Sequence, residues 1–161
     1  MSVYVAVCGP ADATDEERSL AEEVGRRLAE SGAVVVCGGL EGVMDAAARG
    51  AREAGGIAIG VLPGERRAGA SPHLAVAIPT GLGEARNAII VRAADAVIAI
   101  SGEFGTLSEI ALALKMGKPV VGLGTWELRK GDRAVEAIIN AESAKEAVDL
   151  ALEASGGPEP A

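Results

Sequence analysis

The chain has 161 residues, of which 49% are hydrophobic and 24% charged, and its 15 basic against 23 acidic residues give a formal net charge of -8. This composition is typical of a globular protein whose core needs neither a disulfide nor a metal, and the acidic balance disfavours nucleic acid as a partner. Because the sequence lacks a signal-peptide pattern and any apolar run as long as a membrane helix, we expect a cytoplasmic protein without a membrane partner.

Short β-branched runs alternate with helical patterns from one end of the chain to the other. In chain order, they predict a strand at 3–8, a helix after a capping box at 14–17, a strand at 33–37, a helix at 41–54 and a strand at 57–62. After a polar connector at 63–73, they predict a strand at 75–78, a helix at 84–94, a strand at 96–100, a helix at 106–116, strands at 119–123 and 135–139, and a helix from a second capping box at 143–146 to about 153.

This alternation predicts an α/β fold, a single doubly wound, Rossmann-like parallel sheet with helices on both faces. We expect one nucleotide-binding domain over residues 1–154 and a flexible tail at 155–161. In such sheets, ligands bind beyond the carboxyl ends of the strands, where the strand order reverses.

Three strand-to-helix turns expected at this edge are rich in glycine, at 38–42, 81–83 and 102–106. Glycine lets backbone N–H groups and a helix N-terminus approach an anion closely, although it also occurs in such turns for steric reasons alone. Together the three turns predict a phosphorylated ligand. Neither the dinucleotide fingerprint nor the P-loop pattern is present, so a dehydrogenase and a nucleoside triphosphatase are not supported.

The third turn begins a longer motif. Gly102-Glu103-Phe104-Gly105-Thr106-Leu107-Ser108-Glu109 resembles the P-G-G-x-G-T-x-x-E signature of the Lonely Guy family, once labelled lysine decarboxylase-like. Glu84-Ala85-Arg86-Asn87 is similar to the second motif of that family, and the segment from Gly38 to Met44 is similar to its glycine-rich turn. The family releases bases from nucleoside 5'-monophosphates. The bacterial branch that this chain resembles is also similar to the molybdenum cofactor carrier proteins, which bind a ligand without known hydrolysis.

The resemblance implies a nucleoside 5'-monophosphate phosphoribohydrolase with Arg86 and Glu109 as catalytic residues. A carboxylate at Glu109, one turn after Thr106, is suited to stabilise the positive charge that develops on ribose as the N-glycosidic bond breaks. Alternatively, Arg86 and Glu109 form a structural ion pair. The expected ligand-binding residues are Gly38, Gly39, Gly42, Met44, Asn87, Gly102, Glu103, Phe104, Gly105 and Thr106.

A carrier of a phosphorylated nucleotide or pterin-like ligand is the alternative function. The chain has Ser101, Glu103 and Asn87 where the family has Pro, Gly and Lys, and the changes at 103 and 87 favour the carrier. We expect no metal, because the two cysteines have neither a CxxC spacing nor a neighbouring His. We also expect no bound cofactor, since no lysine lies where pyridoxal phosphate would need one. The resemblance implies a homodimer, and the apolar residues 89–91 on the helix of Arg86 are candidates for its interface.

The remaining unusual residues have simpler explanations. Cys8 and Cys37 end apolar runs and are expected to be small buried hydrophobic residues. His73 and the pair Arg66-Arg67 are expected to face solvent, with a lid over a phosphate as the other interpretation for the arginines. Trp126 is either a surface aromatic residue or one that stacks on a ligand.

Overall fold

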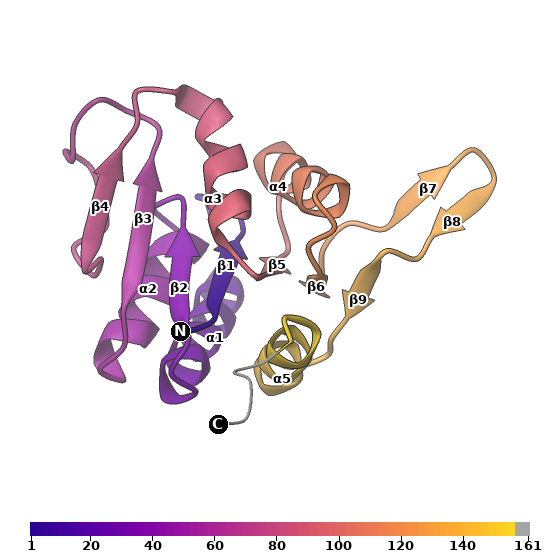
Figure 1. Ribbon diagram of the computed structural model, residues 1–161, viewed down its shortest axis with the longest axis horizontal. Helices are drawn as coiled ribbons and strands as arrows, with labels where there is room; N and C mark the ends of the chain where they lie inside the picture. Colours follow the sequence, from indigo (N-terminus) through magenta and orange to yellow (C-terminus); the bar gives the residue numbers. More distant parts are fainter. Residues whose placement is uncertain (157–161) are drawn as a thin grey trace.

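The computed structural model describes residues 1–156, so positions 157–161 of the expected flexible tail lie outside the described residues. Seven strands form one parallel sheet in the order β4-β3-β2-β1-β5-β6-β9 (Figure 1). Their bounds are β1 Tyr4–Cys8, β2 Val34–Cys37, β3 Ala58–Leu62, β4 Val76–Pro79, β5 Ala96–Ile100, β6 Val120–Leu123 and β9 Ile138–Asn140. The strand order reverses between β1 and β5, which confirms the α/β Rossmann-like fold.

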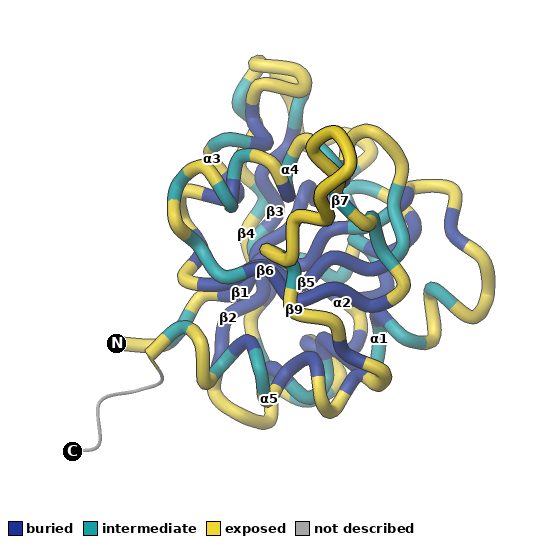
Figure 2. Tube along the Cα trace, turned by 90° about the vertical axis from the view of Figure 1, so that its right-hand side faces the viewer, coloured by how far each residue is buried: buried dark blue, intermediate teal, exposed yellow. Residues whose placement is uncertain are grey.

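Helices cover both faces of the sheet and enclose two aliphatic cores. One face packs against α1 (Asp15–Glu30), α2 (Val43–Glu53) and α5 (Ala144–Ala154), and the other against α3 (Asn87–Ala93) and α4 (Phe104–Lys115). Figure 2 shows the strands as the buried interior between these two layers. The carboxyl ends of the strands, where the glycine turns lie, therefore form one edge of the molecule.

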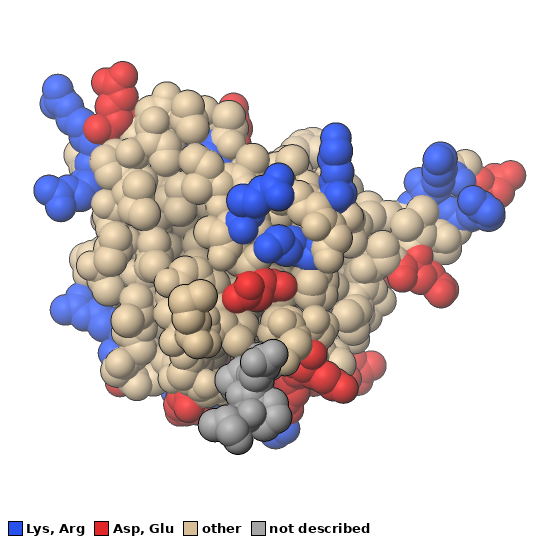
Figure 3. Space-filling view, in the orientation of Figure 1, with Lys and Arg blue, Asp and Glu red and all other residues tan. Residues whose placement is uncertain are grey.

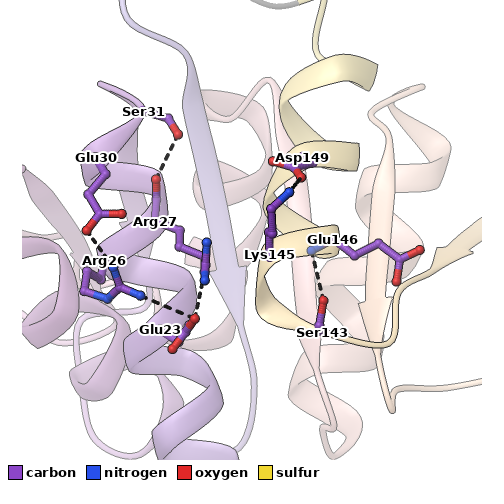
Figure 4. A network of polar contacts seen from close by, with 9 residues as sticks. All are labelled: Glu23, Arg26, Arg27, Glu30, Ser31, Ser143, Lys145, Glu146 and Asp149. Atoms are coloured by element: carbon purple, nitrogen blue, oxygen red, sulfur yellow. Dashed lines mark hydrogen bonds and ion pairs between the residues drawn. The ribbon is translucent and has the colours of Figure 1, made fainter.

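Both expected capping residues begin their helices, but only one capping box is complete. The Thr14 hydroxyl accepts a hydrogen bond from the Glu17 amide at 3.1 Å, and the Glu17 carboxylate accepts one from the Thr14 amide at 2.9 Å. At α5, Ser143 accepts from the Glu146 amide, but the Glu146 carboxylate accepts from the amide before Ser143. The exposed faces of α1 and α5 carry ion pairs three or four residues apart (Figure 4).

Helices α1 and α2 approach each other so closely that each carries a buried glycine at the contact. A Cβ atom at Gly25 would overlap the Ala47 carbonyl oxygen, and one at Gly50 would overlap the Glu22 carbonyl oxygen. Only glycine fits these two positions, because backbone rather than a flexible side chain occupies the space.

The strand expected at 135–139 exists but has the wrong bounds. Residues 128–135 form an antiparallel hairpin of β7 (Leu128–Lys130) and β8 (Arg133–Val135), and β9 starts only at Ile138. The Gly131-Asp132 pair is the turn of this hairpin, with Gly131 at a φ of 60°. The hairpin projects from the body of the protein (Figure 1).

The helix expected at 84–94 is two elements, a 3-10 turn η1 (Gly83–Arg86) followed by the short helix α3. Ile90 and Val91 are fully buried because α3 turns this side toward the sheet, whereas Ile89 is 40% exposed. The expected dimer patch at 89–91 is therefore wrong for two of its three residues.

Among residues 1–156, no helix has the length and apolar character needed to span a membrane.

Candidate functional site

The glycines of the first turn, 38–42, are required by the packing of the chain on itself. A Cβ at Gly39 would lie 2.7 Å from Leu62, and one at Gly42 would overlap the carbonyl oxygens of Pro10 and Ala11. A Cβ at Gly38 would lie 2.6 Å from the sulfur of Met44 and 2.7 Å from Nη2 of Arg86. The steric explanation therefore accounts for this turn.

The second turn closes the loop that precedes it. The amides of Gly81 and Gly83 donate to the carbonyls of Gly64 and Pro63, each at 2.9 Å. Both glycines have positive φ angles, 66° and 58°, which explains their presence in the turn.

The third turn has the features expected of an anion site. Ser101 and Gly102 have φ angles of 51° and 117°, and this left-handed pair leads directly into α4. Glu103 is the N-cap of α4, but its side chain makes no capping hydrogen bond. A Cβ at Gly105 would meet nothing within 4 Å, so the first turn of the helix has open space beside it. Uncapped amides at a helix N-terminus attract anions.

Arg86 is buried beneath the first turn, and its guanidinium is held by the protein. Its Nε donates to the Val61 carbonyl at 2.9 Å and its Nη2 to the Gly38 carbonyl at 3.4 Å, while Nη1 donates to the amide oxygen of Asn87. With 8% of its surface exposed, the side chain ties β3, the first turn and α3 together.

The hydrogen bonds of Asn87 continue from Arg86 to the third turn. Asn87 is 3% exposed, and its Nδ2 donates to the Ser108 hydroxyl at 2.9 Å. That hydroxyl donates to the Gly105 carbonyl at 2.7 Å. Sequence reasoning missed Ser108, although its position one residue before Glu109 in the motif was a signal. The chain of contacts fixes the anion turn relative to α3.

Glu109 is half-buried on the sheet side of α4. Burial raises the pKa of its carboxyl to about 7, against the opposing effects of a hydrogen bond from the Cys8 thiol and of the Arg86 charge. Within residues 1–156, Arg86 and Glu109 form no ion pair closer than 4.0 Å. The alternative of a structural ion pair is therefore wrong.

The two cysteines are buried, as expected. Cys8 belongs to the core between the sheet and helices α3 and α4, and its pKa is well above the usual range because of burial and of the neighbouring Glu109. The Cys37 thiol lies 3.9 Å from the Met44 carbonyl of α2, on the opposite face of the sheet.

Two of the three aromatic residues meet beside the third turn. The rings of Phe104 and Trp126 have centroids 5.8 Å apart and planes inclined by 33°. The indole N–H of Trp126 donates to the Glu103 carbonyl at 3.3 Å. Spacing in the sequence gives no indication of this pair, since the residues come from the turns after two different strands.

These observations define a Rossmann-like protein with an uncapped glycine turn at the switch point of its sheet. The model of the SLOG cluster4 family matches residues 2–153, and the chain belongs to this family. This confirms the resemblance to the Lonely Guy and molybdenum cofactor carrier proteins.

Solved structures and a sequence relative agree over most of the chain. The molybdenum cofactor binding protein of Rippkaea orientalis is 36% identical with a TM-score of 0.85, covering 93% of this chain and 95% of that one. The molybdenum cofactor carrier protein of Chlamydomonas reinhardtii is 34% identical with a TM-score of 0.85, and the match covers 97% of this chain and 99% of that one. A protein of Archaeoglobus fulgidus is 40% identical over 134 residues, 83% of this chain and 88% of its own length.

DNA processing protein A of Helicobacter pylori has the same fold at 20% identity, with a TM-score of 0.72 over 94% of this chain. That structure concerns the binding of single-stranded DNA. The absence of a nucleic-acid partner, expected from the charge of this chain, therefore stays a prediction.

Proposed function

We propose that this protein is a carrier that binds a phosphorylated heterocyclic ligand, a nucleotide or the molybdenum cofactor as cargo, without cleaving it. The phosphate is held by the N–H groups of residues 102–106 at the start of α4. The observation that carries the proposal is the engagement of Arg86, whose three donor nitrogens all bind groups of the protein. Three of its five N–H groups are used in this way, so the guanidinium is fixed within the fold, where it supports the turn.

The state of Glu109 supports the same function. A hydrolase of this type needs a charged carboxylate beneath the ribose. Burial raises the pKa of the Glu109 carboxyl to about 7, so the carboxyl is about half protonated at neutral pH. The similarity to two proteins named for the molybdenum cofactor also favours a carrier.

Hydrolysis is the second candidate function, and the observation that favours it is the position of Glu109, half-buried on α4 one turn after Thr106, where it would act as a general acid or base. A carboxyl that titrates near neutral pH is matched to general acid–base catalysis, which would let Glu109 activate water. Arg86 would then position Glu109 through its charge. In that case Glu109→Gln should lower the rate of base release by about a hundredfold, a loss of roughly 2.7 kcal/mol.

The experiment is to measure binding and base release on the same samples. We expect AMP or GMP to bind, adenosine and guanosine to bind more weakly, and no free base to form after prolonged incubation. Equal affinity for nucleotide and nucleoside would contradict the phosphate site. Base release that Glu109→Gln abolishes would replace the carrier with the hydrolase.

A homodimer belongs to this proposal, although its interface differs from the one expected. Val76 and Ile78 of the edge strand β4 are 45% and 46% exposed, and Ile89 of α3 is also exposed. Figure 3 shows a largely uncharged area over β3, β4 and the neighbouring part of α3. We propose that this area forms the dimer contact.

A further inference from the structure

We propose that Phe104 and Trp126 form a stacking surface for the flat heteroaromatic ring, purine or pterin, of the ligand. This inference rests on the proposed function, because the phosphate of the same ligand would lie on the adjoining turn. The third turn supplies donors for a phosphate and none for the ring, whereas the aromatic pair supplies a surface for the ring.

The exposure of Phe104 is the first observation. Phe104 is the first residue of α4, and it is 76% exposed. The chain has only three aromatic residues, so one of its few large rings is left in solvent instead of being used in the core. Core packing does not explain a large apolar ring in this position. Directly beside the N–H groups of the turn, the ring can contact a ligand whose phosphate those groups hold.

The fixed orientation of Trp126 is the second observation. Its ring packs against the core between the sheet and α3 and α4, and its N–H is bound to the Glu103 carbonyl. A stacking surface that is held in place in the free protein loses little conformational entropy when a ring binds. The contact with Phe104 extends this surface toward the turn.

The shape of the surface next to Trp126 is the third observation. A shallow, open depression of about 330 Å³ lies next to Phe104, and it is lined by Trp126 together with Ser101 and Gly102 of the third turn and with Gly124, Thr125 and Glu127. A Cβ at Gly124 would meet nothing within 4 Å, so this wall is open. The ring of Trp126 and the start of the third turn therefore border the same depression, so one ligand could reach both.

Trp126 also provides the measurement, because it is the only tryptophan in the chain. We expect GMP and neopterin monophosphate to quench its fluorescence and ribose 5-phosphate to leave it nearly unchanged. The relative affinities for GMP and neopterin monophosphate, measured by calorimetry, distinguish a purine ligand from a pterin ligand.

Substitutions of Phe104 and Trp126 test whether these two residues bind the ring. Trp126→Leu and Phe104→Leu should each weaken binding of the preferred ring compound about five- to a hundredfold and leave binding of ribose 5-phosphate unchanged. Trp126→Phe should restore much of the affinity, which a purely structural role of the indole N–H would not allow. Tyr4→Leu is the matched control, because it removes the third aromatic residue, which lies at the amino end of β1 and therefore at the opposite edge of the sheet from the third turn.

The outcomes separate this inference from the proposed function. If ribose 5-phosphate binds but both leucine variants bind GMP and neopterin monophosphate as the wild type does, the ring lies elsewhere and the inference is wrong. If ribose 5-phosphate does not bind while guanosine quenches Trp126, the ring surface stands and the phosphate turn is wrong. If no compound binds to the wild-type protein, both are wrong.

Discussion

Glu103 is the residue whose charge most directly opposes the proposed ligand. It is exposed and lies at the N-cap of α4, where the positive end of the helix dipole attracts an anion. Its φ of -98° is ordinary for any residue, so the backbone does not require glycine here. In the proposed complex this carboxylate would repel the phosphate, and it makes no capping hydrogen bond that would offset the repulsion.

Replacement of Glu103 by Gly should tighten binding of a monophosphate about fivefold, which corresponds to about 1 kcal/mol for a solvent-screened charge pair. Gly is tolerated at an N-cap, so the fold should be retained. Calorimetric titration with GMP measures the change, and Glu136→Gly, which removes an exposed charge on the loop after β8, is the control. Weaker binding in Glu103→Gly would make Glu103 a ligand contact.

The carboxyl of Glu109 should make the stability of the protein depend on pH. Its pKa is raised from 4.5 to about 7 in the folded state, so the native protein binds this proton more tightly than the unfolded chain does. The stabilisation is complete below about pH 4.5 and is lost as the pH rises through about 7. Because the group is half-buried, we expect a loss of about 1–3 kcal/mol.

Denaturant unfolding between pH 5 and pH 8 measures this loss. Glu109→Gln should remove most of the decline, because the amide does not titrate, while Glu153→Gln at an exposed position of α5 should leave it as in the wild type. An unchanged decline in Glu109→Gln would assign the dependence on pH to other groups.

At the scale of elements, the close contact between α1 and α2 should make a Gly-to-Ala substitution destabilising, although helix propensity favours alanine. Alanine is favoured over glycine in a helix by about 1 kcal/mol. Gly25→Ala should nevertheless lower the free energy of unfolding by about 1–3 kcal/mol, since the new methyl group would overlap the backbone of α2. Ser19→Ala, at an exposed position of the same helix, should be neutral or slightly stabilising. Thermal unfolding of the two variants tests the contact.

The hairpin β7–β8 shows where hydrophobic patterns in the sequence fail to predict strands. Its strands have three residues each and pair only with each other among the described residues. Such short strands are too brief to show a hydrophobic pattern that predicts a strand. The apolar residues at 135–139 resemble a single strand, although they belong to the end of β8 and the start of β9. The buried runs at 34–37 and 96–100, by contrast, could be recognised because both of their faces are covered.

At the scale of the molecule, the order of the elements was enough to predict the parallel sheet and the edge that carries the turns. The partners of the site residues were not predictable in this way. Arg86 meets the Val61 carbonyl across 25 positions of the chain, and the Phe104–Trp126 contact joins two separate turns. Such contacts depend on the twist of the sheet and on side-chain rotamers, which residue spacing does not encode.

The proposed dimer is tested by sedimentation of the whole protein. Ile78→Lys places a charge in the uncharged area over β4 and should shift the sedimenting mass from that of two chains to that of one. Leu82→Lys, at another exposed apolar residue outside the named contact, is the matched control. A wild-type protein that sediments as one chain would contradict the dimer.

The hydrogen-bond chain from Arg86 through Asn87 and Ser108 also restricts how this protein can evolve. Lys at 87, which the Lonely Guy motif has in this position, would place an ammonium where a buried amide now bridges two partners, at a cost of several kcal/mol. Because Asn87 and Ser108 bind each other, we expect the destabilising effects of substitutions at these two positions to be non-additive. A change at one position is then selected against or tolerated according to the residue at the other.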